Sequence, residues 1–135
     1  MIGSTGCGTR VTCCEIEPAV FGASSEFARV NHTPEKNPNF TIVFDDGRSH
    51  LQGTRETYDL IISDMRMPDG DGPDFYKQVL ASAPALARRF VFITGDTANP
   101  EAWAFLEDSG VPVIEKPFPA AVFEDAVVRV MTTPL

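Results

Sequence analysis

An apolar run that ends in a single carboxylate constrains the fold of this chain more than any other feature. Leu60, Ile61 and Ile62 have the length and composition of a β-strand that is buried on both faces. The run leads into Asp64, and Pro68 then ends the regular structure. In open α/β sheets, functional side chains lie at the carboxyl ends of strands. Asp64 is therefore either a functional residue or a residue that caps a turn, and the rest of the chain has to decide between the two.

Composition and charge exclude several classes of protein. The chain has 135 residues, of which 43% are hydrophobic, so it is long and apolar enough for one domain with a core. Its apolar runs are far shorter than a membrane span, and it opens without a signal peptide, so we expect a cytoplasmic protein without membrane insertion. A formal net charge of −8 and a pI near 4.6 argue against binding to nucleic acid. We interpret Cys7, Cys13 and Cys14 as reduced thiols, because their spacing fits neither a disulfide framework nor a metal site.

Strand-like and helix-like segments alternate along the chain. Strands are predicted at residues 10–14, 40–44, 60–63, 90–93 and 112–114, and helices at 18–30, 48–57, 73–80, 99–109 and 119–131. The helix after Arg48 is the weakest, because Leu51 is its single large apolar residue and Gly53 lies inside it. The alternation predicts a parallel sheet with helices on both faces. Residues 1–9 are expected to be a flexible leader, 10–131 the folded domain and 132–135 a tail.

Polar side chains follow four of the predicted strands. Glu15 and Glu17 follow the first strand, Asp64 the third, Thr94 the fourth and Lys116 the fifth. Because the carboxyl ends of parallel strands open on one edge of the sheet, we expect these residues to converge. Each one taken singly is equally consistent with an ordinary surface residue. Their joint placement favours the functional interpretation of Asp64.

The chemistry of this set suits phosphoryl transfer. A carboxylate such as Asp64 can attack phosphorus as a nucleophile. The charge on the phosphoryl oxygens then has to be neutralised, and Lys116 and the Thr94 hydroxyl can each contact one oxygen. A divalent cation held by acids at the first strand can contact the third phosphoryl oxygen.

Four segments resemble the receiver domains of two-component response regulators. The resemblance covers about residues 10–131, and its C-terminal two-thirds is most similar to receivers attached to hybrid sensor histidine kinases. It implies a flavodoxin-like fold, a doubly wound five-stranded parallel sheet with strand order 2-1-3-4-5 and helices on both faces. The segments are Tyr58-Asp59-Leu60-Ile61-Ile62-Ser63-Asp64-Met65-Arg66-Met67-Pro68, Asp71-Gly72, Phe92-Ile93-Thr94-Gly95-Asp96 and Glu115-Lys116-Pro117-Phe118.

The resemblance also implies roles and partners. Asp64 would accept a phosphoryl group from a histidine kinase or a histidine phosphotransfer domain, and Thr94 and Lys116 would sense it. The bond between Lys116 and Pro117 would be cis, for which X–Pro bonds carry only a small penalty. Self-association would use the helix after Asn99, the strand at 112–114 and the last helix. The chain would be a free-standing receiver or a piece of a larger kinase, and it would catalyse its own phosphorylation without turning over a separate substrate.

The implied metal site departs from the family pattern. The resemblance places Mg²⁺ between Glu15, Asp64 and the backbone carbonyl of Arg66, with Glu17 as a further candidate ligand. The family normally has a second acid where this chain has Ile16. Isoleucine cannot bind a cation, so we expect weak binding of Mg²⁺.

Two further departures concern signalling and phosphoryl lifetime. Val113 occupies the family's aromatic switch position, so a signal would have to pass through the Thr94 loop and the helix after Asn99. Arg66 and Asp96 each lie two residues after a site residue. Our hypothesis is that they pair across the pocket and hinder the hydrolytic water. The alternative, two solvated charges at the rim, is equally compatible with the sequence, because exposed pairs are weak.

Two other functions compete with a phosphorylatable receiver. Ile16 supports a degenerate receiver that binds a partner without phosphorylation. A phosphatase with an aspartate nucleophile is the third candidate. That chemistry usually requires a second aspartate two residues after the nucleophile, where this chain has Arg66.

Overall fold

The structure is a computed structural model that describes residues 9–15, 18–19, 36–67, 70–95 and 98–134. Its chain separates into two compact units, Met1–Glu56 and Thr57–Leu135. Most of the expected leader and of the first predicted helix lies outside the described residues.

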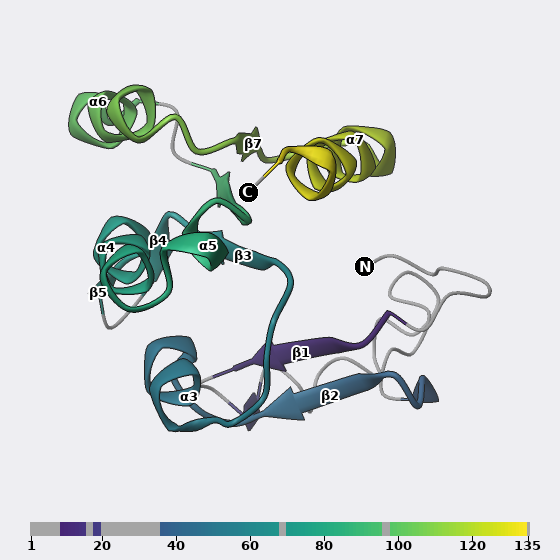
Figure 1. Cartoon of the computed structure of the whole chain (residues 1–135). Helices are drawn as coiled ribbons and strands as arrows, with labels where there is room; N and C mark the ends of the chain where they lie inside the picture. The colour runs from purple at the N-terminus through teal and green to yellow at the C-terminus, as the bar shows by residue number, and fades with distance from the viewer. Residues whose placement is uncertain (1–8, 16–17, 20–35, 68–69, 96–97, 135) are drawn as a thin grey trace. The chain divides into compact units, whose positions relative to one another are not determined.

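The first unit contains a parallel strand pair and a short helix. β1 (Val11–Cys14) pairs with β2 (Phe40–Val43), and α3 (Gly47–Gly53) follows (Figure 1). Asp46 begins the helix, since its carboxylate accepts a hydrogen bond from the Arg48 backbone N–H at 2.7 Å. The Arg48 side chain also donates to this carboxylate, which holds the pKa of Asp46 below its ordinary value. The helix predicted as the weakest is therefore present, and it ends at Gly53, four residues before the predicted end.

The second unit is built on a three-stranded parallel sheet. β3 (Ile61–Asp64) pairs with β6 (Phe90–Thr94), and β6 pairs with β7 (Val113–Glu115). In the order of the predicted strands, the described pairings are 2-1 in the first unit and 3-4-5 in the second. The α/β class with parallel strands is confirmed.

Two small elements were not expected. β4 (Arg66–Met67) and β5 (Gly70–Asp71) form an antiparallel ribbon where the sequence predicts irregular structure, and α5 (Pro84–Ala87) is a single turn. Elements of two to four residues are too short to show a hydrophobic period, so the pattern does not reveal them.

Three longer helices complete the second unit: α4 (Gly72–Ser82), α6 (Pro100–Ser109) and α7 (Ala120–Thr132). The ends of α6 are those predicted, since Asn99 Oδ1 accepts from the backbone N–H of Glu101 at 3.0 Å, and Gly110 ends the helix with φ of 64°. Trp103 lies half-buried on this helix. Within the described part of the chain, every helix is too short or too polar to cross a bilayer.

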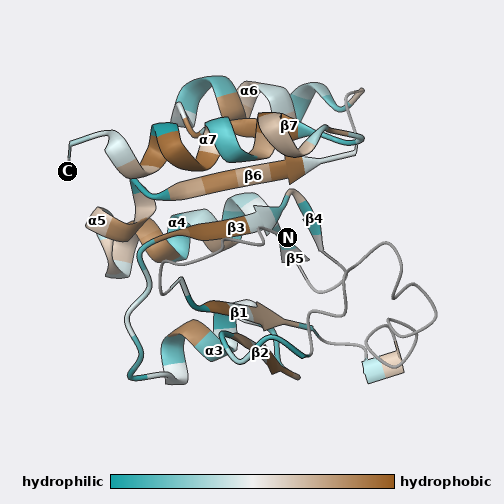
Figure 2. Cartoon of the chain, turned by 90° about the vertical axis from the view of Figure 1, so that its right-hand side faces the viewer, coloured by the Kyte–Doolittle hydropathy of each residue, from teal (hydrophilic) through white to brown (hydrophobic). Residues whose placement is uncertain are grey.

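Helices cover both faces of this sheet (Figure 1). On one face, Tyr76 of α4 packs edge-on against Phe90 and Phe92 of β6 and Phe105 of α6, at centroid distances of 5.4, 6.1 and 6.0 Å. The opposite face forms a second cluster with α7, made of Val91, Ile114 and Val130. The ribbon is apolar along most of β6 and in the first half of β3, which contains Ile61 and Ile62 (Figure 2).

The expected burial of the third strand on both faces is wrong for one residue. Ile61 and Ser63 are buried, whereas Ile62 is 38% exposed. Alternate residues of a strand point to opposite faces, so Ile62 shares the face of its neighbour Val91. The helix on that face, α7, packs against β6 and β7.

Gly72 is required by a close approach between α4 and β3. A Cβ atom at this position would lie 2.5 Å from the carbonyl oxygen of Asp64 and 2.9 Å from the Phe92 ring. We predict that Gly72→Ala lowers the free energy of unfolding by about 1–3 kcal/mol, because the packed backbone has to shift. Chemical denaturation followed by circular dichroism measures this loss.

Gly53→Ala is the matched control, because a Cβ atom at Gly53 would have no neighbour within 4 Å. Alanine restricts the unfolded chain, so this variant should be unchanged or slightly more stable. Equal losses in the two variants would show that the contact with Asp64 is not the cause.

Candidate functional site

Three predicted site residues meet at the carboxyl edge of the second unit's sheet. Asp64 ends β3, Thr94 ends β6, and Lys116 follows β7. Lys116 Nζ lies 2.6 Å from Asp64 Oδ2, and the Lys116 backbone N–H donates to the Thr94 carbonyl at 2.7 Å. Parallel pairing therefore joins residues that are 52 positions apart in the sequence.

Backbone hydrogen bonds hold the segment around Asp64. The Met65 N–H donates to the Ile93 carbonyl at 2.9 Å, and the Gly72 N–H donates to the Met65 carbonyl at 3.0 Å. The Ser63 hydroxyl donates to the Asp64 carbonyl at 3.0 Å. These bonds fix the main chain on both sides of the carboxylate, whose side chain remains available for chemistry.

The Asp64–Lys116 ion pair is open to solvent. The side chains of Asp64 and Lys116 are 39% and 48% exposed, whereas Thr94 is 3% exposed. An exposed pair contributes only about 0–1 kcal/mol to folding, so Lys116 can exchange its partner at little cost to stability. The lysine stem passes Gly95, and the following bond to Pro117 is cis, which is the geometry that the resemblance implied.

Arg66 lies on the ribbon beside the site. It is exposed and directly opposite Asp71. The Gly72 N–H donates to the carbonyl of Met65, the residue before Arg66, so the Arg66–Asp71 pair is of the non-hydrogen-bonded type. The Arg66 carbonyl therefore points away from β5. Asp96 lies outside the described residues, so its pairing with Arg66 stays a prediction.

The expected metal ligands are divided between the two units. Asp64 and the Arg66 carbonyl supply two oxygen donors in the second unit, and oxygen donors suit Mg²⁺. Glu15 follows β1 in the first unit, where its N–H donates to the Val43 carbonyl at 2.9 Å. Ile16 and Glu17 lie outside the described residues. Among the residues that are described, no three His, Cys, Asp or Glu side chains gather in a metal-binding cluster.

Val113 lies on β7 opposite Phe92 and is half-buried. Its short aliphatic side chain has no ring to rotate between a buried and an exposed position. The predicted consequence, a signal route through the Thr94 loop and α6, stays a prediction.

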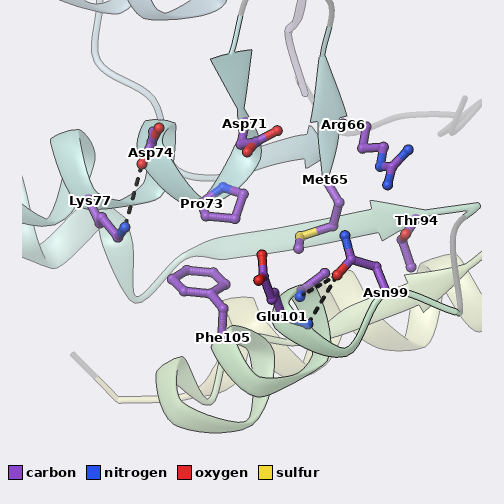
Figure 3. Close-up of a pocket in the computed structure, with 11 residues that line it drawn as sticks. Met65, Arg66, Asp71, Pro73, Asp74, Lys77, Thr94, Asn99, Glu101 and Phe105 are labelled. Atoms are coloured by element: carbon purple, nitrogen blue, oxygen red, sulfur yellow. Dashed lines mark hydrogen bonds and ion pairs between the residues drawn. The ribbon is translucent and has the colours of Figure 1, made fainter.

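A pocket of about 270 Å³, here called the α4–α6 pocket, was missed by sequence reasoning (Figure 3). It adjoins the site through Thr94 and Arg66. Its lining comes from the starts of two helices that are remote in sequence, so only the capping residue Asn99 gave a signal. The lining residues are Met65, Arg66, Asp71, Pro73, Asp74, Lys77, Thr94, Asn99, Glu101, Ala102 and Phe105.

Comparison with known proteins gives a family match and similar folds. The profile of the response regulator receiver domain family matches residues 32–128. The non-phosphorylated HemR receiver domain of Leptospira biflexa superposes with a TM-score of 0.59 at 20% identity, covering 94% of this chain and 97% of that one. A CheY-like receiver domain protein of Methanospirillum hungatei JF-1 gives a TM-score of 0.58 at 17% identity, covering 90% and 93%. At these identities, the similarity shows the shared fold.

One enzyme also shares a segment with this chain. Over 67 residues, the chain is 36% identical to polyamine aminopropyltransferase of Buchnera aphidicola subsp. Schizaphis graminum (strain Sg). The match covers 49% of this chain and only 23% of the enzyme, so the chain spans less than a quarter of that relative's length.

The thiols of β1 are partly buried. Cys13 and Cys14 are free cysteines, and Cys7 lies outside the described residues, so the reduced state of all three stays a prediction. Burial raises the pKa of both thiols, that of Cys14 to about 11, and neighbouring negative charges add to the effect.

We predict slow alkylation of Cys14 in the folded protein. In a Cys7→Ser, Cys13→Ser variant at pH 8, iodoacetamide should modify Cys14 roughly 100-fold more slowly than in the urea-unfolded chain, because the thiolate is the reacting species. The rate should rise as the pH approaches 11, the pKa of the folded state. Intact mass against time gives both rates, and equal rates would contradict the raised pKa.

Proposed function

Since the chain belongs to the response regulator receiver domain family of two-component signalling, we propose that it is a phosphorylatable receiver with Asp64 as the phosphoacceptor. The observation that supports this assignment best is the 2.6 Å ion pair between Lys116 and Asp64 at the carboxyl edge of the sheet, beside Thr94. A phosphoryl group on Asp64 would meet the Lys116 ammonium, and the Thr94 hydroxyl at the same edge of the sheet would be a second donor.

In the proposed reaction, Asp64 attacks the phosphorus of a phosphohistidine. Lys116 holds Oδ2, so Oδ1 is the attacking oxygen. The O–P bond forms as the P–N bond breaks, and the leaving imidazole takes a proton from solvent. Lys116 then contacts one phosphoryl oxygen, and the Thr94 hydroxyl donates to another.

The proposal includes a weakly held Mg²⁺. The proposed ligands are Asp64, the Arg66 carbonyl and Glu15, with Glu17 as a further candidate. Binding would be weak because this chain has Ile16 where the family has a second acid. When bound, the ion neutralises phosphoryl charge.

The proposed phosphodonor is a histidine kinase or a histidine phosphotransfer domain, in the cytoplasm. Because the sequence most resembles receivers attached to hybrid kinases, we propose that this receiver is part of such a kinase. The conformational signal of phosphorylation would pass through α6, because Val113 has no aromatic ring that could rotate. The same helix, with β7 and α7, is the proposed surface for self-association.

The alternative is a degenerate receiver that binds its partner without phosphorylation. Ile16 is the observation that favours it, because a site without a metal would transfer phosphoryl groups slowly. The next experiment separates the two functions.

We predict that acetyl phosphate and Mg²⁺ add one phosphoryl group to the wild-type chain. The adduct should be absent in Asp64→Asn, because an amide is not a nucleophile, and it should be lost when EDTA removes the metal. Intact-mass spectrometry measures the adduct.

Asp59→Asn is the matched control, since Asp59 is exposed and precedes the same strand. This variant should be labelled like the wild type. Failure to label the wild type with any divalent cation would favour the degenerate receiver, and steady phosphate release from a phosphomonoester would favour a phosphatase.

The proposed shielding by Arg66 makes a separate prediction. If Arg66 and Asp96 hinder the hydrolytic water, Arg66→Ala should shorten the lifetime of the aspartyl phosphate by about three- to fivefold. The measurement is the decay of the adduct after removal of the phosphodonor. Arg88→Ala, which removes an exposed arginine elsewhere in the second unit, serves as control. An unchanged lifetime in Arg66→Ala would reject the shielding.

A further inference from the structure

The α4–α6 pocket has a rigid apolar floor. Met65 is 4% exposed, and Ala102 and the Phe105 ring line the pocket beside it. Edge-on contacts with Tyr76 and Phe92, both at 6.0 Å, hold that ring in place. A floor of this kind favours an apolar group of matching size.

The rim of the pocket carries one carboxylate in excess. The lining contains three carboxylates, Asp71, Asp74 and Glu101, and two cations, Arg66 and Lys77. Lys77 Nζ lies 3.5 Å from Asp74 Oδ1. Among the described residues, no cation pairs with the Glu101 carboxylate, which therefore carries the excess negative charge of the lining.

The Glu101 side chain is directed into the pocket. Figure 3 shows it extending from the first turn of α6, between Phe105 and Met65 in this view. The neighbouring ring already attracts a cation, since Lys77 Nζ lies 6.0 Å from the Phe105 centroid. A negative charge and an electron-rich ring therefore face the same space.

We propose that the α4–α6 pocket binds a small organic monocation, an amine that carries one apolar ring or short alkyl group. The ammonium lies at Glu101, and the apolar group lies on Ala102, Phe105 and Met65. The volume of about 270 Å³ falls just below the range of about 300–1,000 Å³ of typical ligand pockets, which restricts the ligand to this size.

Thr94 connects this pocket to the phosphorylation site. It lines the pocket, and its carbonyl accepts the Lys116 N–H. A bound amine would therefore change the environment of Thr94, which would contact the phosphoryl group, and so shift the phosphorylation equilibrium. Phosphorylation would change the affinity for the amine by the same factor. This link rests on the proposed function, whereas amine binding does not.

Benzylamine is the probe, titrated into the unphosphorylated full chain labelled with ¹⁵N. We expect saturable shifts of the Thr94, Glu101 and Ala102 amides with a Kd of about 1 mM, typical of a ligand of this size. Benzoate, which reverses the charge, should give none. No shifts with benzylamine, or equal shifts with benzoate, would overturn the proposal.

Two pairs of variants on α6 test the location. Ala102→Leu fills the pocket and should abolish the shifts, while Ala104→Leu, on an exposed position, should keep them. Glu101→Gln should raise the Kd by about threefold and Glu107→Gln should leave it unchanged. Binding that survives in Ala102→Leu would also overturn the proposal. None of these measurements needs phosphate on Asp64, so failure here is distinct from failure of the phosphoacceptor.

Discussion

The parallel pairing of β6 with both of its neighbours is the constraint on which the site depends. It places the ends of β3 and β6 and the residue after β7 at one edge of the sheet. The backbone bond from Lys116 to Thr94 continues this ladder past the last strand residue. Because main-chain hydrogen bonds set these positions, the side chains of Asp64 and Lys116 contribute little to stability. An exposed ion pair is then sufficient, since the pair does not have to hold the fold together.

The sequence predicted the parts of the fold that depend on local pattern. The strand from Ile61 to Asp64 and the helix between Asn99 and Gly110 were readable, because apolar runs and capping residues act within a few positions. The convergence of Asp64, Thr94 and Lys116 followed from the general geometry of parallel sheets.

The features that the sequence did not reveal depend on distant packing. The exposure of Ile62 depends on which elements pack over its face of the sheet, and the local sequence does not specify them. The α4–α6 pocket forms between side chains such as Asp71 and Phe105, which approach only after both helices have docked on β6. Gly72 could be noted as part of a motif, but its proximity to the Asp64 carbonyl required coordinates.

The position of Trp103 has a practical consequence. It is the single tryptophan of the chain, and it lies half-buried on α6, the helix that adjoins both Thr94 and the pocket. Indole emission depends on local polarity, so Trp103 is an intrinsic fluorescent probe on the helix that we propose for signalling. Conformational change at that helix can therefore be followed in real time by intrinsic fluorescence, without an attached dye.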